Sequence, residues 1–207
     1  MEDIVLEFYQ ALFTSQRLDN FDEILAQIPR VVIAEMNNDL LAKFKANEVE
    51  TALKQMSPLK SPGPDGITPI FCQHYWSLVG SDVVDDILYF LNSGNLPPSL
   101  CHSFITLIPK INNPEYISQY RPISLSNVLY RIFSKVLANK LKKVLPHLVL
   151  EQQSDFVKDK LIFDNTMVAF EILHYMRNHS SRETGYTALK LNTSKAYDRC
   201  NGYIWRN

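Results

Sequence analysis

The residues of this chain best suited to bind a ligand are basic side chains that gather in one segment. Between Cys101 and Leu145 the only acidic residue is Glu115. A local excess of positive charge is typical of surfaces that bind the phosphates of nucleic acids. The cluster from Lys135 to Lys143 also fits a solvated helix face, and the sequence leaves both interpretations open. The basic residues of the segment are Lys110, Arg121, Arg131, Lys135, Lys140, Lys142 and Lys143.

Other reactive side chains are scattered along the chain and predict no second chemistry. The three cysteines, Cys72, Cys101 and Cys200, lie far apart and form no CxxC pair that would indicate zinc or redox chemistry. None of the five histidines stands in a recognisable serine or cysteine nucleophile motif. A hydrolase is therefore disfavoured.

Composition indicates an ordinary globular chain. It has 207 residues, of which 46% are hydrophobic and 21% charged, enough for one core. No run approaches the roughly 18 apolar residues of a membrane span, and the acidic start MEDIVLEFYQ is unlike a signal peptide. We therefore expect an intracellular, soluble protein without membrane contact. Residues 61–100 carry four aspartates and no lysine or arginine, so this neighbouring segment is acidic.

The elements that must position the basic residues follow from hydrophobic periodicity. Helical spacing predicts helices over residues 3–13, 47–56, 68–78, 81–91, 127–145 and 161–176. Two β-rich runs, residues 104–109 and 121–125, predict an antiparallel hairpin, and residues 186–191 predict a further strand. In SPGPDGI, proline presets φ, aspartate can bond the backbone and glycine accepts a positive φ, so this is a shaped turn.

The order of five sequence blocks carries more information than any one of them. The chain reads SPGPDGI, FITLIPK, YRPISLSNVLYRIFSKVLANKL, EQQSDFV with LIFDNTMVAFE, and finally ALKLNTSKAYDR. In this order the chain resembles the first half of a reverse transcriptase from a plant LINE-type (non-LTR) retrotransposon. The resemblance implies an α+β fold, with mostly helical fingers, a small antiparallel hairpin and the first palm strand of a right-hand polymerase. It divides the chain into a helical segment at 1–58, fingers at 59–185 and the start of a truncated palm at 186–207.

The resemblance also assigns roles to single residues. Lys110 and Arg121 stand where the family contacts the nucleotide triphosphate, and Tyr197 stands where it discriminates against a 2′-hydroxyl. RNA template, DNA primer and Mg²⁺ are the implied ligands, with Lys135, Lys140, Lys142 and Lys143 expected to bind nucleic acid. Asn192 replaces the family's metal-binding aspartate. An amide is neutral and offers one acceptor oxygen, so it binds a hard dication poorly.

These departures predict a reverse-transcriptase fragment without catalysis. The family's downstream paired-aspartate hairpin is also missing from the sequence, so no catalytic or metal site is expected to be intact. A non-catalytic module that binds RNA or a partner through its fingers is the alternative. A third possibility is a chain that does not fold stably, with residues 186–191 as an unpaired strand edge.

Overall fold

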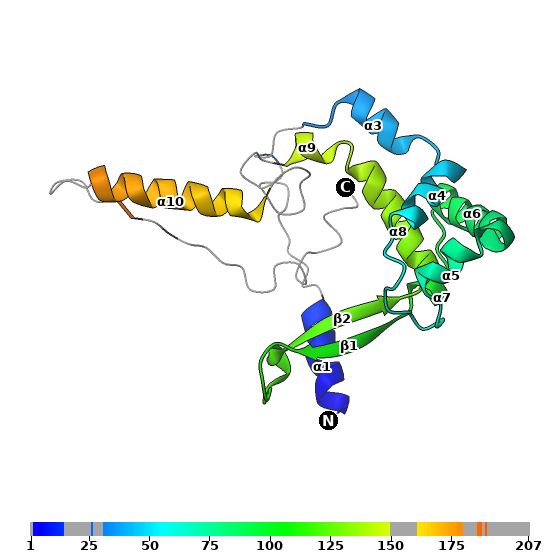
Figure 1. The fold of residues 1–207 in the computed structure, drawn as a ribbon, viewed down its shortest axis with the longest axis horizontal. Helices are drawn as coiled ribbons and strands as arrows, with labels where there is room; N and C mark the ends of the chain where they lie inside the picture. The colour runs from blue at the N-terminus through cyan, green and yellow to red at the C-terminus, as the bar shows by residue number, and fades with distance from the viewer. Residues whose placement is uncertain are drawn as a thin grey trace. The chain divides into compact units, whose positions relative to one another are not determined.

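The computed structural model describes residues 2–14, 26, 31–149, 161–179, 186–187 and 189. It divides the chain into two compact units, one formed by residues 31–148 and the other by the residues before and after them. The described elements are mostly helices, together with one two-stranded antiparallel sheet (Figure 1). The predicted α+β class, mostly helical with a small antiparallel hairpin, is confirmed.

Four helices of the unit 31–148 share one apolar core, because each presents buried residues at helical spacing. On the last of them, Val128, Ile132 and Val136 recur every fourth position and are at most 1% exposed. Ile87 and Val49 from two other helices are fully buried against the same core. The four helices are α4 (Ala46–Lys54), α5 (Pro69–His74), α6 (Trp76–Ser93) and α8 (Val128–Leu141).

The prediction of a helix break near residues 79–81 is wrong. The break lies at Tyr75, and α6 runs without interruption through Gly80. A Cβ added at Gly80 would lie 2.8 Å from Cε2 of Trp76, so glycine here makes room for an indole ring and does not end the helix. Gly94 ends α6, since this residue adopts φ +73 and its N–H donates to the carbonyl of Phe90.

Other helix ends differ from the prediction by a few residues. The helix predicted to run to residue 145 ends at Leu141, and Pro146 lies in the first turn of a separate short helix, α9 (Leu145–Leu148), where a missing N–H costs nothing. The helix predicted over residues 47–56 begins one residue earlier, at Ala46, and Glu48 accepts the N–H of Lys45 at 2.8 Å. Besides α9, the described helices α3 (Ala34–Leu41) and α7 (Pro98–Cys101) were not predicted.

The hairpin is formed by β1 (Ser103–Pro109) and β2 (Tyr120–Ser126), which pair antiparallel as predicted. Its register pairs Ser103 with Ser126 at the base and Pro109 with Tyr120 near the tip. The connection between the strands contains a short 3₁₀ helix, η1 (Ile117–Gln119). Figure 1 shows the two strands extending away from the group formed by α4, α5, α6 and α8.

The other unit contains two described helices, α1 (Glu2–Phe13) and α10 (Ile162–His179), which match the helices predicted over residues 3–13 and 161–176. The predicted strand at residues 186–191 and the segment around Asn192 and Tyr197 fall outside the described residues, apart from Tyr186, Thr187 and Leu189. Within the described part of the chain, no helix is both long enough and apolar enough to cross a membrane.

Candidate nucleic-acid interface

The hairpin register brings Lys110 and Arg121 to the same face of the sheet. Arg121 pairs with Ile108, and opposite residues in an antiparallel pair share a face. Lys110 follows Ile108 by two positions, which keeps it on that face, and its N–H extends the ladder by donating to the carbonyl of Gln119 at 2.8 Å. Both side chains are exposed. Two cations therefore lie diagonally opposed near the hairpin tip, an arrangement suited to an anion with several oxygens.

The connection between the strands holds the end of the Lys110 side chain. Nζ of Lys110 donates to the carbonyl of Ser118 at 2.8 Å. Oε1 of Gln119 accepts hydrogen bonds from the N–H groups of Glu115 and Tyr116 at 2.7 and 3.0 Å. These bonds hold the connection that contains the carbonyl of Ser118. An ammonium group has three donors, so two remain available to a ligand.

The turn of the SPGPDGI block clamps the base of the hairpin. The N–H of Gly66 donates to the carbonyl of Gly63 at 3.0 Å, with φ +69 at Gly66, and Oδ1 of Asp65 accepts the N–H of Ile67 at 3.1 Å. A Cβ added at Gly63 would lie 2.4 Å from the backbone carbon of Ser126, the last residue of β2. Only glycine therefore allows this turn to lie directly against the strand.

Asn127 completes the clamp from the other side. It is 8% exposed, and its Oδ1 accepts the N–H of Asp65 at 3.2 Å while its Nδ2 donates to the carbonyl of Ser99 at 3.4 Å. One side chain thus ties the turn, the segment before β1 and the start of α8 together. Asn127 was not singled out from the sequence, because its partners lie 62 and 28 residues away.

Of the four lysines predicted to bind nucleic acid in α8 and just after it, all except Lys140 are exposed or partly exposed. Arg131 and Lys135 recur at a spacing of four, which places them along one side of the helix, beside the buried stripe. Arg131 and Lys135 are partly exposed, and Lys142 and Lys143 are exposed just after the helix ends. Arg131 was counted among the basic residues of the sequence but was not assigned to nucleic-acid binding.

Lys140 points into the protein instead. It is 7% exposed, and its Nζ donates to the carbonyl of Ala42 and lies 3.8 Å from the centre of the Phe44 ring. A cation over an aromatic ring is stabilised by the negative face of the ring. The position of Lys140 in the interior gives it a structural partner, and the expectation that it binds nucleic acid stays a prediction without support from this geometry.

The positive charges of the hairpin and α8 are not neutralised within the described residues. The only ion pair found there joins Lys54 to Glu50 on α4, outside this surface. Uncompensated cations on one unit attract phosphates and make their binding depend on salt. We define the basic surface as Lys110, Arg121, Arg131, Lys135, Lys142 and Lys143.

No metal centre is formed by the part of the chain that the structure describes. No group of three or more histidine, cysteine, aspartate or glutamate side chains there could hold a metal ion. Asn192 and Tyr197, which the sequence assigns to the metal and sugar positions, lie outside the described residues. Their roles stay predictions.

Comparison with known proteins places these features among retrotransposon proteins, although no protein-family model matches the chain. Over 204 residues, 96% of its length, the chain is 32% identical to the "Transposon TX1 uncharacterized 149 kDa protein" of Xenopus laevis. Over 167 residues, 80% of its length, it is 29% identical to the retrovirus-related Pol polyprotein from the type-2 retrotransposable element R2DM of Drosophila melanogaster. A Pol polyprotein from a type-1 retrotransposable element R2 of Popillia japonica is 25% identical over 153 residues, 73% of this chain.

The chain spans only a small part of these relatives, 15% of the first two and 20% of the third. The match nevertheless covers most of this chain, including the hairpin and the helices that hold it. The chain is therefore related to the proteins of non-LTR retrotransposons.

Proposed function

We propose that the chain is part of the reverse transcriptase of a non-LTR retrotransposon. In this proposal residues 59–185 form the fingers, residues 1–58 a helical segment upstream of them and residues 186–207 the start of the palm. The observation that carries the proposal is the hairpin, whose register puts Lys110 and Arg121 on one face. The order of the sequence motifs and the retrotransposon relatives support it. Origin in a plant element stays a prediction from the motifs.

Lys110 and Arg121 are proposed to hold the triphosphate of an incoming deoxynucleotide. A guanidinium presents paired donors that match two phosphate oxygens, whereas an ammonium acts as a mobile point charge. The carbonyl of Ser118 holds one Lys110 donor and leaves the others available. Tyr197 is proposed to lie under the sugar of the same nucleotide.

The rest of the basic surface is proposed to hold the backbone of an RNA template and a DNA primer. Arg131 and Lys135 lie along one side of α8, and Lys142 and Lys143 follow its last residue. Contacts to phosphates fix position and carry no sequence information, so this binding should be largely independent of sequence. Lys140 is not included, because its ammonium is already engaged by Ala42 and Phe44.

Polymerisation by this chain is proposed to be absent because of Asn192. Mg²⁺ ions supply charge neutralisation at the transferred phosphate in nucleotidyl transfer. An amide at position 192 is a poor substitute for a carboxylate as a ligand of such an ion. The proposed role therefore rests on binding by the basic surface alone.

A second candidate function is a module that binds RNA without any link to polymerisation. The uncompensated charge on α8 favours it, since this charge lies on a different element from the nucleotide-binding pair on the hairpin. The two candidates differ in what they expect of Lys110 and Arg121. A simple RNA-binding module would not need deoxynucleotide triphosphates to bind at the hairpin.

Binding can be measured by fluorescence anisotropy with labelled RNA and with a labelled deoxynucleotide triphosphate, at several salt concentrations. Arg121→Ala should weaken both ligands, and in RNA binding each lost phosphate contact should reduce the slope of log K against log salt by about 0.7–0.9. Lys54→Ala is the matched control, because it removes one exposed lysine outside the basic surface. If Lys54→Ala and Arg121→Ala behave alike, the hairpin is not the site.

Primer extension on an RNA template with Mg²⁺ tests the proposed inactivity. We expect no extension by the unaltered chain at a concentration that saturates the template. Extension by the unaltered chain would overturn the proposal. Extension by Asn192→Asp alone would show that the amide blocks catalysis and that carboxylates other than the expected paired aspartates complete the site, and it would support a polymerase origin over a simple RNA-binding module.

A further inference from the structure

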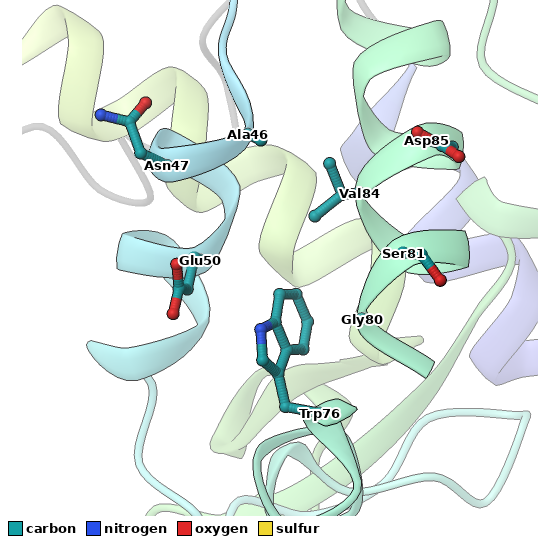
Figure 2. A pocket seen from close by; sticks show the side chains of 8 residues that line it. All are labelled: Ala46, Asn47, Glu50, Trp76, Gly80, Ser81, Val84 and Asp85. Atoms are coloured by element: carbon teal, nitrogen blue, oxygen red, sulfur yellow. The ribbon is translucent and has the colours of Figure 1, made fainter. Parts of the chain in front are cut away.

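A pocket outside the basic surface opens between α4 and α6 of the unit 31–148. Its volume is about 340 Å³, at the lower end of the range for small-ligand sites. Figure 2 shows the indole of Trp76 standing between the two helices, with Glu50 on one side and Ser81 and Asp85 on the other. Asn47 and Val84 complete the rim. The pocket is thus lined by one aromatic ring, two carboxylates and a small number of neutral groups.

Gly80 is the reason that the indole forms a wall of this pocket. Trp76 precedes Gly80 by one helical turn, and a Cβ at Gly80 would lie 2.8 and 2.9 Å from two ring carbons. Without a side chain at position 80 the ring lies against α6, where one part packs on the core and another part lines the pocket. The ring therefore offers a flat surface in a fixed position.

The two charged residues that line the pocket are both acidic. Glu50 comes from α4 and Asp85 from α6, and α6 also exposes Asp82 and Asp86 nearby. Residues 61–100 contain no lysine or arginine. Lys54 pairs with Glu50 at 2.7 Å, but both side chains are exposed, so a stronger partner could replace this pair at little cost. The pocket should repel phosphates and attract cations.

We infer that this pocket binds an arginine side chain from a basic segment of a partner protein. A guanidinium is planar, stacks on an indole face and donates paired hydrogen bonds to a carboxylate. The pocket is lined by both kinds of partner, with Trp76 for stacking and a carboxylate on either side, Glu50 on α4 or Asp85 on α6, for the hydrogen bonds. Its volume suits one long side chain. Nucleic acid would be held by the basic surface and protein by this pocket, which lies on other elements of the same unit.

Titration of the complete chain with short peptides tests this inference. The Trp205→Phe background leaves Trp76 as the only tryptophan, so its fluorescence reports on the pocket. The probe is the pentapeptide Gly-Arg-Gly-Arg-Gly, compared with the same peptide carrying citrulline, which keeps the shape of arginine but is neutral. We expect saturable binding of the arginine peptide and roughly tenfold weaker binding of the citrulline peptide, because charge-assisted hydrogen bonds are lost.

Two variants of α6 sharpen the test. Asp85→Asn removes a charge that lines the pocket, whereas Asp82→Asn removes the same charge from the same helix outside the lining residues. Asp85→Asn should weaken the arginine peptide by roughly tenfold and Asp82→Asn by much less. Equal losses would show a diffuse acidic face and overturn the inference.

Other outcomes also count against the pocket. An unchanged Trp76 fluorescence up to millimolar arginine peptide would overturn the inference, as would equal affinity for the citrulline peptide. If a uridine oligonucleotide quenched Trp76 fluorescence and the arginine peptide did not, the pocket would bind a nucleobase and not an arginine. None of these outcomes depends on the basic surface, so Arg121→Ala should leave peptide binding unchanged.

Discussion

In the helical group of residues 31–148, four helices bury apolar residues against one another. Many apolar side chains of the hairpin, in contrast, are exposed to solvent. Ile87 and Ile132 in the helices are fully buried, but Phe104 and Ile123 in the strands are 55% and 41% exposed. The hairpin therefore lacks a core of its own. Its shape depends on the main-chain ladder and on the clamp formed by Gly63 and Asn127 at its base.

This difference explains how the proposed nucleotide-binding pair can be held in place. Lys110 and Arg121 lie near the tip of a hairpin whose strands contain no buried residue, so their position depends on contacts at the opposite end of the strands. A rigid helical group supports a clamp, and the clamp sets the direction of the hairpin. Sites carried by such extended elements are sensitive to changes in their support.

The largest expected effect comes from the helical core. Ile132→Ala should lower the free energy of unfolding by about 2–5 kcal/mol, because it leaves a cavity at a fully buried position. Ile123→Ala in the hairpin is the matched control and should cost less than about 1 kcal/mol, since the side chain is 41% exposed. Urea unfolding followed by far-ultraviolet circular dichroism measures both. Equal losses would contradict the contrast between the two regions.

The next largest effect is expected at the turn that supports the base of the hairpin. Gly63→Ala should cost about 1–3 kcal/mol, because the added methyl group meets the backbone of Ser126 at 2.4 Å. Hydrogen exchange of the amides in β1 and β2 should become faster, while the amides of α8 near Ile132 stay protected.

The control for the clamp is Gly66→Asn in the same turn. Gly66 has φ +69 and open space around its Cα, and asparagine tolerates this conformation better than other residues. It should change hairpin exchange far less than Gly63→Ala. If Gly63→Ala leaves the exchange of both strands unaltered, the turn does not support the hairpin.

Lys140 and Lys142 are two positions apart, and their replacement should have smaller effects on two different quantities, stability and RNA binding. Lys140→Met should lower stability by about 1–2 kcal/mol, because it removes the hydrogen bond to Ala42 and the contact with the Phe44 ring. It should not alter the salt dependence of RNA binding. Lys142→Met should do the reverse, with stability within about 0.5 kcal/mol of the parent and a salt slope reduced by about one. The same response from both variants would mean that burial does not decide which lysine meets RNA.

Local patterns predicted most elements because their causes are local. Alternating β-rich runs predicted both strands, and apolar residues every three or four positions predicted α1, α8 and α10. The turn of SPGPDGI was also predicted correctly, since proline, aspartate and glycine act within a few bonds.

Most of the features that were missed depend on distant partners. Gly80 is the exception, because its partner Trp76 lies only four positions earlier in the same helix. The burial of Lys140 could not be predicted, because it rests on Ala42, 98 residues away in the sequence. Asn127 likewise acquires its role only when the turn and α7 come together. The charge of a residue is visible in the sequence, whereas its surroundings are set by the fold.

The smallest expected effect compares cysteines from the two regions. Cys72 lies in the helical core, where burial raises the pKa of its thiol and the nearby Asp65 carboxylate raises it further. Cys101 is exposed in α7, just before the hairpin. In a Cys200→Ser background, a disulfide reagent at pH 8 should label Cys101 more than about tenfold faster than Cys72, because Cys72 has less thiolate and less access.

The raised pKa of Cys72 also predicts how stability changes with pH. The thiol of an unfolded chain titrates near 9.0, so at higher pH the folded chain binds more protons than the unfolded one. The free energy of unfolding should be unaffected near pH 7 and should fall as the pH rises past 9.0. Cys72→Ala should remove this part of the alkaline loss, and Cys101→Ala should not. Rapid labelling of Cys72 in the folded chain would show that α5 opens as readily as the exposed region, and the contrast between core and hairpin would then not extend to α5.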